Sequence, residues 1–163
     1  MAELTNREIV ERFVQAQASR DPGLGDEYIA EDVVEDYPQS GERIRGRANR
    51  NAIFENYPGR AEHDFGSAHV RTVVGEDQWV MTPTLSLLRI NGAGERYTGT
   101  GLITYPNGEV WHLVQLIEMR GGKIAKLITY FAAPFEAPAW RAKWVERTPD
   151  PAISATATLP PRE

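Results

Sequence analysis

The sequence contains no cysteine and only three histidines, and both scarcities exclude whole classes of site. Without cysteine, the chain can form neither a disulfide nor a thiolate that attacks a substrate or binds a metal ion. The histidines are too few and too scattered to indicate a metal centre. The sequence also lacks a glycine-rich phosphate-binding loop, so we expect neither a metal ion nor a cofactor.

Long apolar runs are missing as well. No stretch of the sequence is apolar for long enough to cross a membrane. Residues 1–10 alternate charged with apolar side chains, which is unlike a secretory signal. We therefore expect a cytoplasmic protein without a membrane partner.

Positive charge is also in short supply. The formal net charge is −5, which argues against a nucleic-acid partner because binding phosphates requires a surplus of Lys and Arg on one face. One basic cluster departs from this balance, and acidic residues surround it. We interpret it as a solvated charged face. It consists of Arg43, Arg45, Arg47 and Arg50, among Glu42, Glu55 and Glu62.

The first part of the chain has helical patterning. Thr5 and Glu8 have the spacing of a capping box, in which each side chain satisfies the backbone N–H of the other residue. Apolar residues then recur at helical spacing, and Asp21-Pro22-Gly23 ends this first helix. We expect a short second helix at residues 25–30, a strand at 33–37 and a third helix at 47–57.

After residue 60 the apolar period changes from about 3.6 to 2, which predicts strands. Short breaks rich in glycine separate the runs, so neighbouring strands should be antiparallel. Pro83 lies inside one run and predicts a bulge or bend. Gly99 and Gly101 lie on one face of another run and indicate curvature. The expected strands are residues 67–74, 78–90, 96–105, 109–120 and 123–131.

The C-terminal region divides into two segments. Residues 132–147 carry Phe135, Trp140 and Trp144 between prolines. We expect an ordered aromatic arm that packs back on the domain, with a short helix at 139–145. The alternative is a surface for a partner protein. Residues 148–163 are rich in Pro, Ala, Ser and Thr and predict a flexible tail. The size of the chain fits a single domain, residues 1–147.

Several local motifs resemble those of one superfamily. Residues 9–14 (IVERFV) resemble its first helix, and residues 30–38 (AEDVVEDYP) resemble the entry to its first strand. Gly122-Lys123-Ile124 and Tyr130-Phe131 resemble its last hairpin. The chain is similar in this way to the nuclear transport factor 2-like superfamily, and within it to the SnoaL-like, polyketide-cyclase-like branch. The resemblance covers most of residues 5–147.

This resemblance implies an α+β fold. A cone-shaped, curved antiparallel sheet packs on three N-terminal helices, in a cystatin-like roll. It also implies a pocket for a small hydrophobic molecule, in which a carboxylate or polar dyad moves one proton as in isomerases, cyclases and dehydratases. The epoxide hydrolases of the superfamily need an Arg and two Asp around one water. No Arg-x-Asp pair occurs on the predicted strands, so that activity is disfavoured.

The resemblance places the catalytic base directly before a proline on the first strand. Pro38 puts Tyr37 at that position and Asp36 one residue earlier. Because one step along a strand moves a side chain to the other face, two arrangements remain open. Either Tyr37 lines the pocket together with Glu35, or a bulge beside Pro38 turns Asp36 inward.

The second proton donor of the superfamily lies on the penultimate strand, where the resemblance places Gln115. Alternation puts Trp111, Leu113 and Gln115 on one face of this strand, and we expect Trp111 to form a pocket wall. His112 and Glu118 share the other face, where we expect them to border a dimer contact; an acid or base role for His112 is the alternative. Tyr97, Tyr130 and Phe13 are further candidates for substrate binding.

Two functions from different classes follow. The first is an acid–base enzyme that acts on a small hydrophobic molecule, with Asp36 or Tyr37 as base or hydrogen-bond donor. The second is a non-catalytic ligand-binding or dimeric assembly module. A one-sided sheet with apolar residues on its outer face predicts a homodimer in either case.

Overall fold

The computed structural model describes residues 4–19, 22–56, 80–81, 85–104 and 110–148. Two α-helices, two 3-10 helices (η) and seven strands make up this part of the chain. They follow in the order α1 (Asn6–Ser19), η1 (Pro22–Tyr28), β1 (Ile29–Tyr37), β2 (Glu42–Arg45), α2 (Arg47–Glu55), β3 (Val80–Met81), β4 (Leu85–Ala93), β5 (Arg96–Thr104), β6 (Val110–Arg120), β7 (Lys123–Ala132) and η2 (Ala139–Trp144).

The capping box is confirmed at the start of α1. The backbone N–H of Thr5 donates to Glu8 Oε2 at 2.8 Å, and the backbone N–H of Glu8 donates to Thr5 Oγ1 at 3.3 Å. Two N–H groups that have no partner within the helix are thereby satisfied. These hydrogen bonds also lower the pKa of Glu8. The cap therefore stabilises the N-terminal end of α1.

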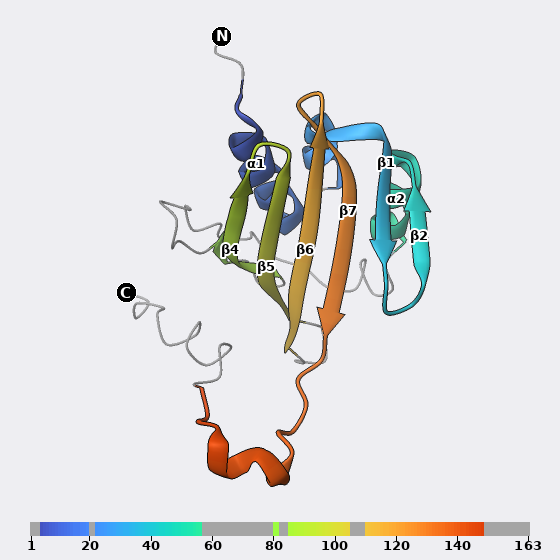
Figure 1. Ribbon diagram of the computed structural model, residues 1–163. Helices are drawn as coiled ribbons and strands as arrows, with labels where there is room; N and C mark the ends of the chain where they lie inside the picture. The colour runs from blue at the N-terminus through green and yellow to red at the C-terminus, as the bar shows by residue number, and fades with distance from the viewer. Residues whose placement is uncertain (1–3, 20–21, 57–79, 82–84, 105–109, 149–163) are drawn as a thin grey trace, which may run out of the picture.

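The strands form one twisted sheet in the order β2-β1-β7-β6-β5-β4-β3 (Figure 1). The pairs β4–β5, β5–β6 and β6–β7 are antiparallel, as their short connections predict. Gly121 and Gly122 both have positive φ and form the two-residue turn between β6 and β7. β2 pairs antiparallel with β1 and was absent from the predicted elements.

The expected all-antiparallel sheet on three helices needs two corrections. First, β1 runs parallel to β7, so the sheet is mixed. Short connections make neighbouring strands antiparallel, but β1 and β7 are far apart in the chain and are not joined by such a connection. Second, the predicted second helix is the 3-10 turn η1, which leaves α1 and α2 as the two α-helices. The sequence of η1, PGLGDEY, carries two glycines and begins with a proline, and both residues disfavour a longer α-helix.

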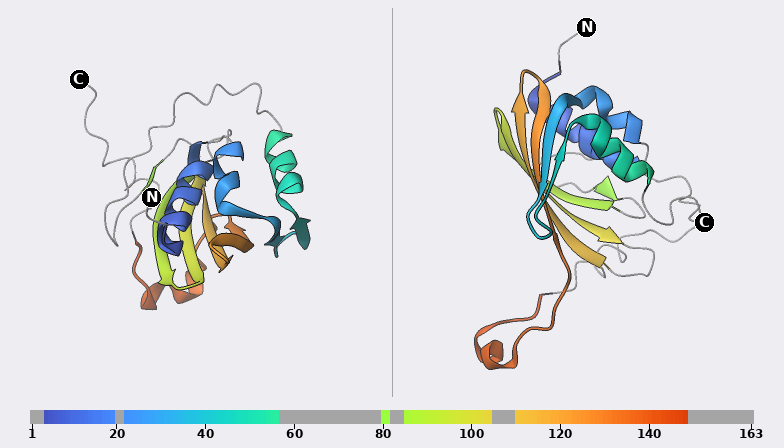
Figure 2. Two further views of the ribbon diagram at one scale, coloured as in Figure 1. Left: turned by 90° about the horizontal axis from the view of Figure 1, so that it is seen from above. Right: turned by 90° about the vertical axis from the view of Figure 1, so that its right-hand side faces the viewer.

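Both α-helices lie on the same side of the sheet (Figure 2). We call this side the inner face and the opposite side the outer face. α1 contacts β4 and β7, and α2 contacts β1. Apolar residues of α1 pack against the inner residues of the strands and form the main core. Its members are Ile9, Val10, Phe13, Val14, Ile29, Val33, Ile90, Tyr97, Ile117, Met119, Ile124 and Leu127.

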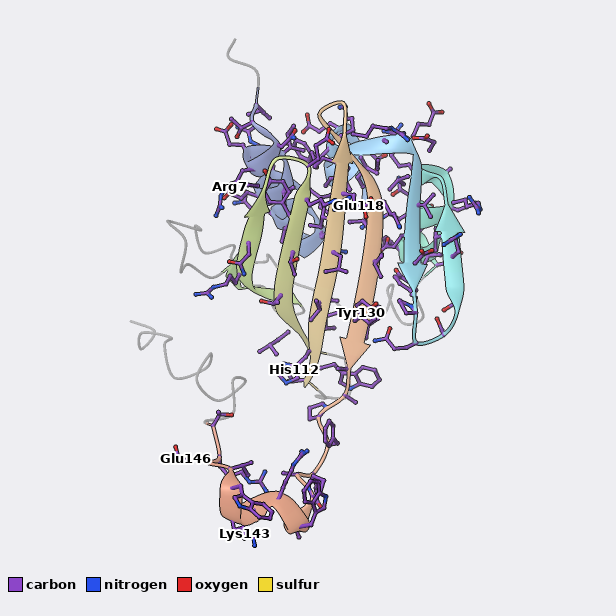
Figure 3. All side chains as sticks on the ribbon, viewed as in Figure 1. Arg7, His112, Glu118, Tyr130, Lys143 and Glu146 are labelled. Atoms are coloured by element: carbon purple, nitrogen blue, oxygen red, sulfur yellow. The ribbon has the colours of Figure 1, made fainter. Side chains whose placement is uncertain are left out.

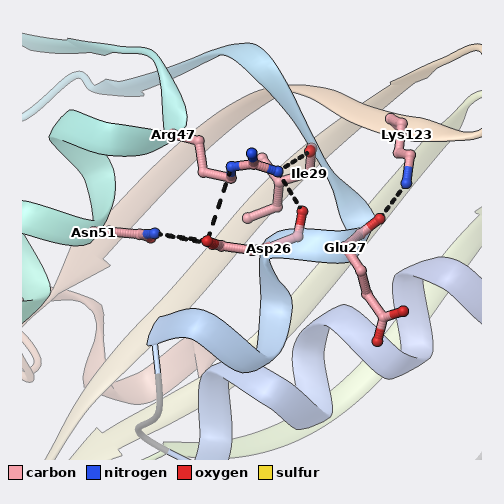
Figure 4. Close-up of polar contacts among 6 residues, drawn as sticks. All are labelled: Asp26, Glu27, Ile29, Arg47, Asn51 and Lys123. Carbon is pink, nitrogen blue, oxygen red and sulfur yellow. Dashed lines mark hydrogen bonds and ion pairs between the residues drawn. The ribbon is translucent and has the colours of Figure 1, made fainter.

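A second set of contacts ties α2 to η1 (Figure 4). Arg47 Nη1 donates to the backbone oxygen of Asp26 at 2.8 Å. Asn51 Nδ2 donates to both carboxylate oxygens of Asp26, at 2.9 and 3.0 Å. Lys123, at the start of β7, donates to the backbone oxygen of Glu27. The bonds of Arg47 and Asn51 thus join α2 to η1, and the bond of Lys123 joins η1 to β7.

The aromatic arm does not pack on its own domain, contrary to the prediction. Phe135, Trp140 and Trp144 are 81%, 74% and 69% exposed. In Figure 1 the segment after β7 extends away from the sheet. The predicted helix at 139–145 is the 3-10 helix η2. Because the arm leaves β7 at the edge of the domain, local sequence alone does not determine which surface its rings contact.

Some predictions lie outside the described residues. They are the strand at 67–74, the bulge at Pro83 and the tail from residue 149 onward.

Candidate functional site

Four polar side chains form a buried chain of hydrogen bonds on the inner face. Arg50 Nε donates to Glu35 Oε2 at 3.0 Å. Thr129 Oγ1 donates to the other carboxylate oxygen, Oε1, at 2.8 Å. Gln115 Nε2 donates to Thr129 Oγ1 at 3.1 Å. The four residues are between 2% and 5% exposed. We call them the buried polar network.

Strand alternation explains how three of the four residues reach the inner face. On β1, Val33 and Glu35 are buried while Val34 and Asp36 are half-buried on the other face. On β6 the burial of Leu113, Gln115 and Ile117 follows the same period. Gln115 lies directly opposite Thr129 of β7. The parallel pairing of β1 with β7 then brings Glu35 within hydrogen-bond distance of Thr129.

Arg50 is the member that comes from a helix. Its guanidinium carbon lies 5.3 Å from the centre of the Phe13 ring and 4.7 Å from the centre of the Phe54 ring. Phe54 follows Arg50 by four residues, so both occupy one face of α2. Cation–π contact with two rings lowers the cost of removing the guanidinium from water. The negative charge of Glu35 offsets the remaining desolvation cost.

The network lies where the apolar core ends. On β6 and β7, toward α1, the inner residues Ile117, Met119 and Leu127 belong to the core. Along β1 and β7 in the other direction, Tyr37 and Phe131 meet edge to face, with ring centres 5.4 Å apart. Gly99 of β5 is the partner of Gln115 and contributes no side chain beside it. A buried charge pair thus adjoins the core on one side and aromatic residues on the other.

The structure brings some of the predicted site residues together. Gln115 belongs to the buried polar network, and Phe13 contacts Arg50. Trp111 and Tyr37 are half-buried on the inner side of their strands. Tyr97 is buried in the core between α1 and the sheet. These residues occupy the inner half of the fold, on either side of Gln115.

Asp36 lies on the outer face instead. It accepts hydrogen bonds from Arg43 of β2, with Nε–Oδ1 and Nη2–Oδ2 distances of 2.6 and 2.8 Å. These bonds hold the pKa of Asp36 below its usual value and raise that of Arg43. Of the two arrangements left open by the sequence, the structure has the one in which Glu35, and not Asp36, faces inward.

Tyr130 also differs from its expected place. It is 40% exposed and lies on the outer face, while its neighbour Thr129 points inward to Gln115 (Figure 3). The physical reason is the two-residue period of a strand, because adjacent residues point to opposite faces. His112 and Glu118 are exposed on this outer face too, as alternation on β6 predicts.

Sequence reasoning missed Arg50 and Thr129. It assigned Arg50 to a solvated charged face, but the residue is 3% exposed. Two other members of that cluster are also engaged, Arg43 with Asp36 and Arg47 with Asp26. The signal that could have identified Arg50 was its position one helical turn before Phe54, which places both side chains on one face of the helix. Thr129 carried no comparable signal.

This arrangement has a definite chemical capacity. Glu35 can accept a proton from a group placed beside it, and Arg50 can stabilise negative charge nearby. Within the described ranges, no three His, Asp or Glu side chains gather closely enough to hold a metal ion. Likewise, none of the described helices is both long and apolar enough to traverse a bilayer.

Comparison with known protein families gives a match over more than half of the chain. The family model described as a SnoaL-like domain matches residues 10–127. This range contains Glu35, Arg50 and Gln115 but ends before Thr129. No curated protein matches the chain at a significant level.

Solved structures with the same fold are similar over most of the chain. An NTF-2 like protein of unknown function from Burkholderia xenovorans LB400 is 32% identical, with a TM-score of 0.67, covering 88% of this chain and 95% of that one. A protein of Kribbella flavida DSM 17836, provisionally described as a ketosteroid isomerase, is 22% identical, with a TM-score of 0.68, covering 90% and 91%. TerC, co-crystallized with polyporic acid, is 20% identical, with a TM-score of 0.54, covering 77% and 90%. The last two likenesses concern the fold alone.

Proposed function

Because the chain belongs to the SnoaL-like domain family of the nuclear transport factor 2-like superfamily, we propose that it binds a small hydrophobic molecule at its inner face and transfers a proton on it. Glu35 is the base in this proposal. The observation that carries it is the buried polar network, in which a glutamate and an arginine are held together with two neutral hydrogen-bonding groups.

Stability alone is a weak explanation for such a network. Removing two charges from water costs several kcal/mol per ion, and a well-packed apolar pair of similar volume is often as stable. A buried carboxylate beside a cation, at the edge of an apolar core, supplies both a proton acceptor and a stabilising positive charge. Glu35 and Arg50 have these properties, whereas the outer carboxylates Asp32 and Asp36 pair with exposed arginines.

The proposed step is an allylic proton shift in a β,γ-unsaturated ketone, in which the C=C bond moves into conjugation with the carbonyl group. The Glu35 carboxylate removes a proton from the carbon next to the carbonyl group, and the C–H electron pair moves into the enolate. Positive charge on Arg50 stabilises the enolate oxygen. Neutral Glu35 then returns the proton to a different carbon, so that atoms and charges balance. Thr129 and Gln115 hold the Glu35 carboxylate in one orientation.

Hydrogen–deuterium exchange tests this step. The purified protein is incubated in D2O with 2-tetralone, a small apolar ketone with an acidic C–H, and exchange is followed by NMR. We expect exchange above the buffer rate. Glu35→Gln should lower the enzymatic rate by about 10²–10⁴-fold, the usual contribution of a general base.

Asp36→Asn is the matched control, because it removes the neighbouring carboxylate on the opposite face of β1. We expect this variant to keep the rate of the wild type. Loss of exchange in Asp36→Asn, with exchange retained in Glu35→Gln, would identify Asp36 as the base instead of Glu35. Binding of 2-tetralone without any exchange would favour the non-catalytic alternative.

A second candidate function, a dimeric assembly module, is favoured by the outer face. Leu116 and Tyr130 are 36% and 40% exposed. They neighbour half-buried Ile128 and Val114 through the pairs Leu116–Ile128 and Val114–Tyr130. The two α-helices lie on the inner side and leave these residues uncovered. A homodimer through this patch would sediment as a dimer at micromolar concentration, and Tyr130→Lys should dissociate it. A wild-type monomer would refute the assembly.

A further inference from the structure

We propose that Arg50 makes the site selective for apolar acids, and that it binds a ligand carboxylate through its two terminal nitrogens, Nη1 and Nη2. This inference rests on the proposed function, since it names a second ligand class of the same site, acids that compete with the ketone substrate. It goes beyond that function because an acid–base site needs no acidic ligand. The steps that lead to it concern hydrogen-bond capacity, geometry and charge.

The first step is a count of donors. A guanidinium carries five N–H groups on three nitrogens. The hydrogen bond to Glu35 uses Nε. Among the described residues, no acceptor is bound to Nη1 or Nη2. Both Glu35 oxygens, by contrast, already accept a hydrogen bond, from Arg50 and from Thr129. Each of these oxygens keeps a further acceptor site, with which Glu35 can act as the base. The free hydrogen-bond donors of the pair lie on Arg50, and the group that complements them is one that only accepts.

The second step is geometry. Nη1 and Nη2 form the end of a planar fork that matches the two oxygens of a carboxylate. Phe13 and Phe54 lie close to the guanidinium, at 5.3 and 4.7 Å from its carbon. A ligand whose acid group meets the fork can thus place an apolar body beside aromatic rings. A lysine could not replace this fork, because an ammonium group is a point charge.

The third step is charge. Glu35 and Arg50 compensate each other, so a second carboxylate adds one uncompensated negative charge to a buried site, which is costly. Among the described residues, the groups bonded to Glu35 are Arg50 from α2, Thr129 from β7 and, through Thr129, Gln115 from β6. Of these, Glu35 is the one able to take up a proton. Binding of the acid should therefore be accompanied by uptake of about one proton. Because neutral Glu35 cannot act as the base, the acid binds as a competitor of the ketone and not as its substrate.

Calorimetric titration with two matched probes tests the inference. The probes are 2-naphthoate and its neutral analogue 2-naphthamide. We expect the wild type to bind the acid at least tenfold more tightly than the amide. Titration of the acid in two buffers of different ionisation enthalpy should show the proton uptake, which an arginine with a purely structural role would not produce.

Variants separate recognition from folding. Arg50→Gln alone leaves Glu35 charged and buried, so the double variant Glu35→Gln/Arg50→Gln is used, in which two amides can still bond to each other. The double variant should bind 2-naphthoate and 2-naphthamide equally and should take up no proton. Arg47→Gln, one turn away on α2, changes the contact with η1 and should keep the preference for the acid.

The outcomes distinguish the two proposals. Equal binding of both probes by the wild type would overturn the role of Arg50 while leaving ligand binding intact. An acid preference that survives in the double variant, or that Arg47→Gln abolishes equally, would overturn it too. Failure of the wild type to bind either naphthalene probe would count against the proposed binding function and, with it, against this inference.

Discussion

The ion pair between Glu35 and Arg50 allows a sharp prediction for the stability of the fold. The perturbation is a double-mutant cycle of Glu35→Gln, Arg50→Gln and the two together. Both side chains are almost fully buried, at 3% and 4% exposure, and their charged atoms are 3.0 Å apart. Each single change removes one charge and leaves the other buried without compensation.

The magnitude follows from the burial. Removing one partner of a buried pair costs about 3–5 kcal/mol. Glu35→Gln keeps an oxygen that can accept from Thr129, so this hydrogen bond survives in the variant. The double variant leaves no buried charge and should cost less than either single change. If the single costs simply added, the double variant would lose about 6–10 kcal/mol, so we expect a coupling free energy of about 3 kcal/mol or more.

Urea unfolding followed by circular dichroism measures these free energies. The total stability of such a domain is about 5–15 kcal/mol, so the single variants can be substantially destabilised without being unfolded. Asn51→Gln/Arg50→Gln serves as a control pair on the same helix, because Asn51 bonds to Asp26 and not to the network. Additive effects for Glu35 and Arg50, with no more coupling than in the control, would refute the idea that their charges compensate each other.

Two further predictions concern the outer surface. Arg43 lowers the pKa of Asp36, so this pair contributes stability above the usual aspartate pKa and loses it as the pH falls through the folded value. Asp36→Asn should therefore lower the melting temperature at pH 7, and its difference from the wild type should shrink toward pH 3; a constant difference would contradict the linkage. Deleting residues 133–147 should shift the melting temperature by less than about 2 °C, because the rings of Phe135, Trp140 and Trp144 are exposed in the single chain. A large loss of stability would show that the arm packs against the protein in solution.

Local signals predicted much of the fold correctly. Thr5 and Glu8 form the predicted cap. Glycine-rich breaks gave the correct antiparallel order for the strands from β4 to β7. Alternation on β6 separated Gln115 from His112 and Glu118. Each of these features depends on residues close together in the chain, where a capping bond, a turn or the two-residue strand period determines the result.

The candidate site was less predictable, because it depends on contacts between distant segments. The sequence could not decide whether Glu35 or Asp36 faced inward. The register of β1 beside β7 decides it, through a hydrogen bond between residues 94 positions apart. Arg50 is four residues before Phe54 and three after Arg47, and local charge favoured a solvated role for it. Only the docking of α2 on β1 gives it a buried glutamate as partner.

The absence of cysteine excluded thiol chemistry from the start, and the sequence by itself also determined the helical first segment, the strand hairpins and the family resemblance. These are properties of composition and of short-range patterns. The tertiary structure decided that the sheet is mixed, that Glu35 is the inward carboxylate and that the aromatic arm leaves the domain. Strand pairing over long distances and the desolvation of a charge are properties of the assembled fold, because they depend on which surfaces meet and on what those surfaces exclude from water.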